Sequence, residues 1–217
     1  VLEFIAYDKD QLYNEIQKHD FTKYISNKQT IAIDVKVKEC KLHDQRFVAM
    51  RIKDAIVDQF RDQTGERPNV DAKNPDLRIH VQATKNNFWV ALDTSGSSLY
   101  QRGYRTEVGI APLKENLAAG LLILTEWDRK SPLVDPMCGS GTFLIEAAMM
   151  YMNMAPGTLR KRFGFQSWKN YNKQVWEKLV NEAMEREIEA PEEKLFFGYD
   201  IDNQMIKKAR INAQNAN

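Results

Sequence analysis

Residues 135–150, DPMCGSGTFLIEAAMM, decide the fold of this chain. They combine an acidic residue, a glycine-rich turn and an apolar run of helical length, and the short apolar stretch SPLV precedes them as a strand. A strand entering a glycine-rich turn that opens a helix is the geometry by which α/β proteins bind nucleotides, because glycine lets a ligand approach free backbone N–H groups. The alternative is a turn that only connects a strand to a buried helix and binds no ligand. Neighbouring features of the sequence must decide between these two interpretations.

Two familiar turn motifs do not fit this stretch. A phosphate-binding P-loop needs a lysine after its second glycine, but Gly141 is followed by Thr142 and Phe143. The nucleophile elbow Gly-x-Ser-x-Gly also fails, because Cys138 and Thr142 stand two residues either side of Ser140. The sequence therefore disfavours ATP, GTP and a serine hydrolase.

The dinucleotide fingerprint Gly-x-Gly-x-x-Gly is absent too, since Leu144 stands where its third glycine belongs. What remains is a turn that begins with Asp135, whose carboxylate can hold a positively charged or hydroxyl-bearing ligand. Such a turn suits a nucleoside with an amino-acid tail and no phosphate. S-adenosylmethionine is a ligand of this kind.

A second acidic residue follows the next strand of this half. In KLFFGYDID, residues 195–197 predict a strand buried on both faces, and Asp200 follows at its carboxyl end, where open α/β sheets bind ligands. The alternative for Asp200 is an ordinary turn aspartate. Asp202 is predicted to cap the following helix, whose inward face would carry Met205, Ala209 and Ile211.

The N-terminal half reads as a smaller α+β region. Alternating apolar residues predict a strand at residues 30–38 and a hairpin at residues 77–83 and 88–93. Between them, apolar residues about four apart predict a helix at residues 44–62, ended by Gly65. Residues before 30 begin with a short apolar run and a helical pattern.

A serine- and glycine-rich stretch at residues 94–110 breaks the periodicity and is typical of a connection between domains. After it, Pro112 occupies a first-turn helical position. A stripe of leucines then predicts a helix that runs to about residue 127: Leu113, Leu117, Leu121 and Leu124.

Composition excludes several classes of protein. Lys and Arg number 31 against 30 for Asp and Glu, so there is no overall positive field, although a local basic patch remains compatible with this balance. Cys40 and Cys138 lie far apart without metal-ligand spacing, which argues against disulfides and structural zinc and favours a reducing cytoplasm. The longest apolar run, residues 117–124, is far short of the roughly 20 residues needed to span a bilayer.

The stretches DPMCGSGTFLIEAAMM, GYDID and SLYQRGYR resemble the THUMP-domain RNA methyltransferases of the UPF0020 family, in particular bacterial enzymes that methylate the exocyclic 2-amino group of guanine in 23S rRNA. The resemblance covers nearly the whole chain. It implies an α/β fold in which a ferredoxin-like and THUMP α+β region precedes the first part of a Rossmann-like class I methyltransferase domain. The implied ranges are a ferredoxin-like piece at 1–29, a THUMP-like RNA-binding domain at 30–100 and a truncated methyltransferase domain at 101–217.

The resemblance also implies an S-adenosylmethionine site. Asp200 would bind the ribose hydroxyls and Ile201 would lie beside the adenine. Met137 departs from a commoner glycine, as it does in amino-group methylases, and Cys138 is predicted to be a packed residue without an activated thiolate. The methionine half of the cofactor would lie along the turn formed by Asp135, Pro136, Met137, Cys138, Gly139, Ser140 and Gly141.

Methyl transfer needs groups that hold the target amine in line with the methyl donor. In the family, an Asn/Asp-Pro-Pro-Tyr/Phe tetrapeptide supplies them, and residues 1–217 contain no such tetrapeptide. The chain also starts at Val1 and stops inside a helical pattern at Asn217. We therefore expect an inactive fragment that carries most of the cofactor turn and no catalytic residues.

An insertion separates Asp135 from Asp200, because the spacing far exceeds the roughly 20 residues of a simple nucleotide-binding unit. Within it, RKRFGFQSWKNYNKQVW interleaves basic and aromatic residues, as expected where RNA phosphates and unstacked bases meet protein; the alternative is a solvated basic face over a small aromatic core. In the SLYQRGYR connection, Arg102 and Arg105 either contact RNA or cap the preceding sheet. The candidate RNA contacts are Arg102, Arg105, Arg160, Lys161 and Arg162.

These features together predict a cytoplasmic, S-adenosylmethionine-dependent methyltransferase that modifies an exocyclic amine of an RNA base, with neither a membrane nor a metal as partner. The favoured base is guanine of 23S rRNA. One alternative is a DNA adenine-N6 methylase, which shares the Asp-Pro-x-x-Gly-Ser-Gly turn. Another is an RNA-binding module with an incomplete methyltransferase half. The sequence fixes neither the modified nucleotide nor the oligomeric state.

Overall fold

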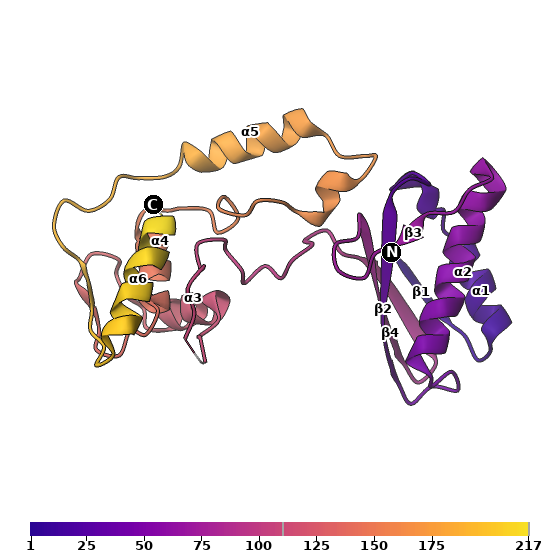
Figure 1. Ribbon diagram of the computed structural model, residues 1–217, viewed down its shortest axis with the longest axis horizontal. Helices are drawn as coiled ribbons and strands as arrows, with labels where there is room; N and C mark the ends of the chain where they lie inside the picture. The colour runs from indigo at the N-terminus through magenta and orange to yellow at the C-terminus, as the bar shows by residue number, and fades with distance from the viewer. Residues whose placement is uncertain (110, 217) are drawn as a thin grey trace. The chain divides into compact units, whose positions relative to one another are not determined.

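A computed structural model describes residues 1–109 and 111–216 of the chain (Figure 1). The chain forms two compact units. The first unit is Val1–Gly96 with Arg162–Tyr171, and the second is Ser97–Lys161 with Asn172–Asn217. Each unit has its own sheet and its own buried core.

The first unit is built on a five-stranded sheet. Its strands are β1 (Leu2–Ile5), β2 (Thr30–Lys38), β3 (Asn69–Val70), β4 (Leu77–Thr84) and β5 (Asn87–Leu92), in the order β1-β5-β4-β2-β3. β2 pairs with β4 in parallel, and β4 pairs with β5 antiparallel. The two residues of the β4–β5 turn, Lys85 and Asn86, have φ of 51° and 65°, as a tight hairpin turn requires. The predicted strand at 30–38 and the predicted hairpin are confirmed.

Two helices cover one face of this sheet, α1 (Lys9–Gln17) and α2 (Gln45–Thr64) (Figure 1). Asp8 and Asp44 cap their N-termini by accepting hydrogen bonds from backbone N–H groups, and Gly65 ends α2 with φ of 78°. The inward side chains of both helices join the buried residues of β2, β4 and β5 in one apolar core. The predicted helix at residues 44–62 is confirmed.

Two further segments complete the first unit. β1 pairs with β5, and the short helix η1 (Phe21–Lys23) buries Phe21, so residues before 30 belong to the same sheet and core. The second segment is Arg162–Tyr171, which contains the short helix η2 (Gly164–Ser167) and lies far downstream in the sequence, beyond the boundary expected at residue 100. The indole Nε1 of Trp168 donates to Asp76 O at 3.2 Å, and Lys169 N donates to Tyr24 O at 2.7 Å.

The second unit has two parallel strands, β6 (Leu133–Asp135) and β7 (Phe196–Gly198), with four helices. These are α3 (Glu115–Leu124), α4 (Thr142–Tyr151), α5 (Lys173–Met184) and α6 (Asn203–Asn215). The prediction that this second strand is buried on both faces is wrong, because Phe196 and Phe197 are half-buried in a sheet of two strands. None of the residues of α5 is buried.

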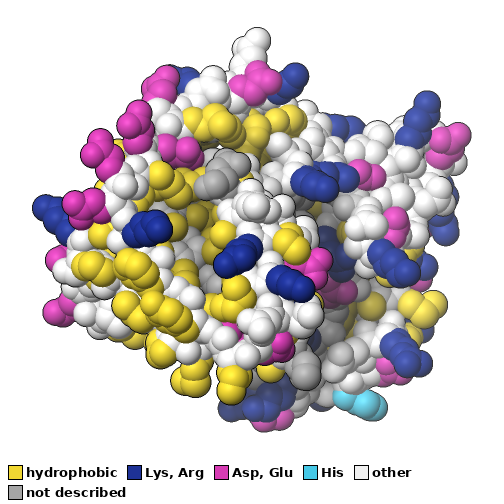
Figure 2. All heavy atoms as spheres, turned by 60° about the vertical axis from the view of Figure 1, so that its left-hand side comes forward, with side chains coloured by type: hydrophobic (Ala, Val, Ile, Leu, Met, Phe, Trp, Pro, Cys, Tyr) yellow, Lys and Arg dark blue, Asp and Glu magenta, His cyan; other side chains and the backbone are white. Residues whose placement is uncertain are grey.

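The buried face of α3 differs from the one predicted from its leucines. α3 packs against α4 through Ala118 and Leu122, while Leu117 is 51% exposed and Leu124 is 79% exposed. The buried positions Ala118 and Leu122 therefore each lie one residue after a predicted leucine. Figure 2 shows apolar side chains gathered on the surface that comes forward from the left-hand side of Figure 1. Within the described residues, the helices are all too short or too polar to cross a lipid bilayer.

Candidate functional site

The carboxyl ends of β6 and β7 form one edge of the second unit, and the glycine-rich turn starts there. Asp135 lies opposite Gly198 in the parallel pair. Beyond the strands the pairing continues, because Tyr199 N donates to Asp135 O at 2.9 Å and Cys138 N donates to Tyr199 O at 2.8 Å. The turn and the loop after β7 are thus held side by side, as the sequence predicted for two strands of a ligand-binding edge.

Asp200 connects these two loops through its carboxylate. Its Oδ2 accepts a hydrogen bond from Gly139 N at 2.9 Å, and its Oδ1 accepts from Asp202 N at 2.9 Å. Asp135 accepts from Met137 N at 3.0 Å through its own carboxylate. Two carboxylates therefore lie at the same strand edge, each fixed by backbone N–H groups.

The two glycines of the turn have different requirements. Both adopt the left-handed region, with φ of 53° at Gly139 and 86° at Gly141. A Cβ at Gly141 would lie 3.1 Å from Ala209 Cβ, so glycine is needed there for close packing of α6. A Cβ at Gly139 would meet nothing within 4 Å, so the backbone at Gly139 borders open space.

That open space belongs to a hollow of about 330 Å³ beside the turn. Asp135, Gly139 and Ser140 line one side of it, and Leu113 and Met205 line another. Within the turn, whose residues are all described, the backbone N–H groups of residues 137, 138, 139 and 141 already have partners, whereas that of Ser140 has none. The hollow thus offers a backbone donor and a carboxylate to a ligand.

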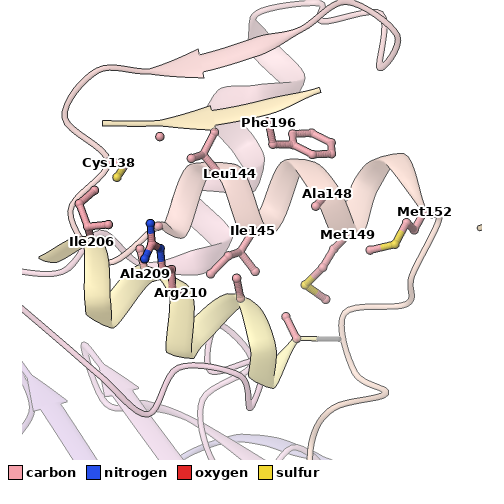
Figure 3. Close-up of a pocket in the computed structure, with 14 residues that line it drawn as sticks. Cys138, Leu144, Ile145, Ala148, Met149, Met152, Phe196, Ile206, Ala209 and Arg210 are labelled. Atoms are coloured by element: carbon pink, nitrogen blue, oxygen red, sulfur yellow. The ribbon is translucent and has the colours of Figure 1, made fainter. Parts of the chain in front are cut away.

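Not every residue expected to bind the cofactor lines this hollow, and Asp200 lies outside its lining and contacts it through the hydrogen bond from Gly139. Ile201 is fully exposed on the loop after β7, and Pro136 borders a separate apolar groove along β6. Gly141 borders a larger apolar hollow of about 440 Å³ between α4, α6 and β7, shown in Figure 3, and Cys138 borders both hollows. That hollow is lined almost entirely by aliphatic and aromatic side chains, so it offers few groups for a polar ligand.

Cys138 has the packed role that the sequence predicted. Its side chain is buried, and burial raises the pKa of its thiol, with further increases from the carboxylates of Asp135 and Asp200. A raised thiol pKa disfavours the thiolate that a nucleophile needs. The predicted helix cap is also confirmed, because Asp202 Oδ1 accepts from Gln204 N at 2.8 Å.

Arg105 is bonded to the residue that directly follows the turn. Its guanidinium donates to Thr142 Oγ1 at 2.7 Å and to Leu113 O at 2.6 Å, and it lies 3.5 Å from a carboxylate oxygen of Glu115. Thr142 is the first residue of α4. The side chain of Arg105 is 9% exposed, which leaves little of it for RNA.

Arg102 is similarly enclosed. It forms an ion pair with Glu146 of α4 at 3.3 Å, and the hydroxyl of Tyr104 donates to the same carboxylate at 3.1 Å. Burial raises the pKa of the Glu146 carboxyl, against the opposing effect of the Arg102 guanidinium. The sequence did not reveal this buried cluster, because Glu146 lies in an apolar run that carries no sign of a partner.

The other residues predicted to contact RNA differ in their bonding partners and in their exposure. Arg160 donates to the carbonyl oxygens of Ser97, Ser98 and Gln101 within the second unit, at 2.7 to 2.9 Å. Arg162 belongs to the first unit, where it pairs with Asp76 at 3.3 Å while its side chain remains 55% exposed. Lys161 is exposed. Their contacts with RNA stay predictions.

Sequence reasoning missed one buried residue of this region, Asn212 of α6. Asn212 is completely buried, whereas Ile211, predicted to face inward, is 42% exposed. Asn212 continues the helical spacing from Met205 and Ala209, but the pattern of apolar residues favours its neighbour Ile211. The amide of Asn212 reaches the turn by donating to Ser140 O at 3.1 Å.

The chain is similar to known methyltransferases. The chain is 41% identical, over 99% of its length, to the ribosomal RNA large subunit methyltransferase K/L of Syntrophotalea carbinolica, and it spans 31% of that protein. The chain thus covers about a third of the length of the curated relatives it matches.

Two solved structures are also similar to the chain. A Listeria monocytogenes protein described as a predicted N6-adenine-specific DNA methylase is 31% identical with a TM-score of 0.89, over 100% of this chain and 56% of that one. SMU.472, crystallised in complex with SAH, is 35% identical with a TM-score of 0.85, over 99% of this chain and 56% of that one.

Residues 6–93 match the THUMP domain, which corresponds to the sheet and helices of the first unit. Residues 102–217 match the RMKL-like methyltransferase domain, UPF0020, and include the turn, Asp200 and Asn212. This match extends over more than half of the chain. The chain belongs to the UPF0020 family of RMKL-like methyltransferase domains.

Proposed function

We propose that this chain is the RNA-binding and cofactor-binding part of an S-adenosylmethionine-dependent methyltransferase that modifies the exocyclic amine of a base in RNA. The favoured target is guanine of large-subunit ribosomal RNA. The observation that carries the proposal is the carboxylate of Asp200, which lies 2.9 Å from the glycine-rich turn at the ends of two parallel strands.

The residues present fit this cofactor. The backbone at Gly139 is open to a ligand, the N–H of Ser140 is free to donate, and the neighbouring hollow of about 330 Å³ carries no phosphate-binding lysine. When bound, the cofactor supplies the methyl group. Asp200 would accept hydrogen bonds from the ribose hydroxyls, and the turn from Asp135 to Gly141 would hold the amino-acid end.

We propose that the first unit binds RNA. It includes the THUMP match, and its segment Arg162–Tyr171 carries basic and aromatic residues. Lys161 and Arg162 remain proposed phosphate contacts because both are exposed, whereas Arg102 and Arg105 are given the structural role of holding α4. A structured RNA would be recognised by shape, with its target base turned out toward the cofactor.

The groups that orient the target amine are proposed to lie outside residues 1–217, because the Asn/Asp-Pro-Pro-Tyr/Phe tetrapeptide is absent from them. The chain alone would then bind the cofactor without transferring its methyl group. Action on ribosomal RNA implies a cytoplasmic location.

Calorimetry of S-adenosylhomocysteine binding tests the cofactor assignment. Asp200→Ala should weaken binding by tenfold or more, about 1.4 kcal/mol. Asp202→Ala is the matched control, because Asp202 lies two residues away and caps α6 without contacting the turn. Equal affinity of wild type and Asp200→Ala would refute the ribose assignment.

A second experiment tests the substrate. Methyl incorporation by the whole protein that contains this chain is compared between unmodified ribosomal RNA and duplex DNA. Label in RNA supports the proposal, whereas label in DNA alone would favour the adenine-N6 methylase.

A further inference from the structure

Asn212 makes an unusual set of contacts for a residue in the last turn of a helix. Its side chain is 0% exposed, and it uses the full hydrogen-bonding capacity of its amide. Oδ1 accepts from Thr106 N and Glu107 N, both at 3.1 Å. Nδ2 donates to Glu107 O at 2.8 Å and to Ser140 O at 3.1 Å.

This pattern fixes the orientation of the amide. Two N–H donors face Oδ1 and two carbonyl oxygens face Nδ2, so a flipped amide would lose all four bonds. Asn212 therefore joins three segments that are far apart in the sequence: α6, the connection at residues 106–107 and the glycine-rich turn.

The hydrogen bond from Asn212 to the turn is made to the peptide unit between Ser140 and Gly141. Ser140 O accepts from Asn212, and the N–H of the same peptide unit, that of Gly141, donates to Cys138 O at 2.8 Å. On the other side of Ser140, Gly139 N donates to Asp200. The turn is thus held before and after Ser140, while the N–H of Ser140 itself remains free beside the hollow.

We propose that Asn212 is a positioning residue for the cofactor turn. It holds the Ser140 carbonyl so that the turn keeps the conformation in which its free N–H group and the Asp200 carboxylate meet the same ligand. A rigid turn needs no reorganisation when the ligand binds, so the effect of Asn212 is on affinity. This inference rests on the proposed cofactor site.

A neighbouring asparagine offers a matched control. Asn215 lies one turn further along α6 and donates to Tyr104 O at 3.0 Å and to Thr106 Oγ1 at 2.9 Å. Asn215 therefore bonds α6 to the connection before α3, as Asn212 does, but it makes no hydrogen bond to the glycine-rich turn. A role limited to holding α6 against the connection would give the two asparagines similar effects.

The test compares wild type, Asn212→Ala and Asn215→Ala by calorimetry with S-adenosylhomocysteine. Asn212→Ala should weaken binding by at least tenfold, and Asn215→Ala by less than threefold. Asn212→Asp adds a second variant, since its carboxylate still accepts from residues 106 and 107 but cannot donate to Ser140 O when ionised. Measured at alkaline pH, it should lose affinity like the alanine variant.

Hydrogen exchange without any ligand gives an independent readout. In Asn212→Ala, the hydrogen-bonded amides of Gly139 and Gly141 should exchange at least tenfold faster than in wild type, whereas those of β4 in the first unit should be unchanged. Unchanged exchange in the turn would overturn the inference, as would unchanged affinity of both Asn212 variants. A wild-type chain that binds no S-adenosylhomocysteine would refute the proposed cofactor site instead, and exchange would still decide the role of Asn212.

Discussion

The interiors of the two units are stabilised by different kinds of interaction. The core of the first unit is a single apolar cluster to which β2, α2, β4 and β5 all contribute. The core of the second unit contains few apolar residues, yet it holds nearly all of the buried polar residues of the described chain: Glu115, Ser140, Thr142, Glu146 and Asn212, against Gln59 in the first unit. The unit that carries the candidate site therefore depends on hydrogen bonds and ion pairs that fit only one geometry.

The largest effect should come from the apolar core of the first unit. Phe60 of α2 is 1% exposed, and Phe60→Ala should lower the free energy of unfolding by about 3–5 kcal/mol, because it leaves a cavity. Urea denaturation followed by circular dichroism measures the change. Phe47→Ala on the same helix is the control, since Phe47 is 44% exposed; an equal loss in both variants would contradict the assignment of the core.

A comparable loss in the second unit should follow from breaking one ion pair. Arg102→Ala leaves the carboxylate of Glu146, whose side chain is 4% exposed, buried without its cation. The expected loss is about 3 kcal/mol. The double variant Arg102→Ala with Glu146→Gln should recover part of it, because no charge then remains buried. If thermal denaturation shows both variants to be equally unstable, the pair acts through packing instead.

The two units should respond to pH in opposite directions. Burial raises the pKa of Glu146 above 4.5, so the folded second unit binds the proton more tightly and loses stability as pH rises from 4.5 through the folded pKa. In the first unit, the hydroxyl of Thr22 lowers the pKa of Asp20 below 3.8, so that contribution is present above 3.8 and is lost as pH falls through the folded pKa.

Hydrogen exchange from pH 3 to pH 7 can follow the two units separately. Glu146→Gln should abolish the loss of stability with rising pH in the second unit, and Asp20→Asn should abolish the acid sensitivity of the first. The same pH dependence in Glu146→Gln as in wild type would show that another group is responsible.

The smallest effects should come from the helix caps. The N-cap residue of α2 is Asp44, whose carboxylate accepts two backbone N–H bonds, whereas that of α3 is Lys114, which makes no side-chain cap. Asp44→Ala should cost roughly 1 kcal/mol, and Lys114→Asp should stabilise the second unit by a few tenths to 1 kcal/mol. Thermal denaturation measures both changes, and a destabilised Lys114→Asp would show that the start of α3 is set by other contacts.

The same contrast explains how much could be predicted from the sequence. In the first unit, apolar residues alternate along β2 and β4 and recur about every four residues in α2, so burial follows from spacing alone. Those predictions are confirmed. At the candidate site, the turn and Asp200 were predicted because parallel strands bring their carboxyl ends together, and the bond between Gly139 and Asp200 agrees with that expectation.

The remaining features could not be read from apolar spacing. In α3 the leucines outnumber the positions that a neighbouring helix covers, and apolar residues are often exposed, so Leu117 and Leu124 indicated the wrong face. In α6 the inward position is polar, and its partners are backbone groups that any sequence supplies. Arg102 and Arg105 were predicted to contact RNA because nothing in the sequence indicates their buried partners. The carboxylates of these partners, Glu146 and Glu115, lie far away in the sequence or in an apolar context.

The segment Arg162–Tyr171 has a consequence for how this protein could be inherited or rearranged. A Cβ at Gly164 would lie 2.9 Å from Asp93 O, so the segment sits directly against the backbone of the first unit. The gene encodes this part of the first unit inside the coding region of the second. A single recombination event at the end of the β-hairpin would therefore transfer an incomplete domain. A complete first unit is encoded only by a stretch that runs through Tyr171 and so includes Ser97–Lys161 of the second unit.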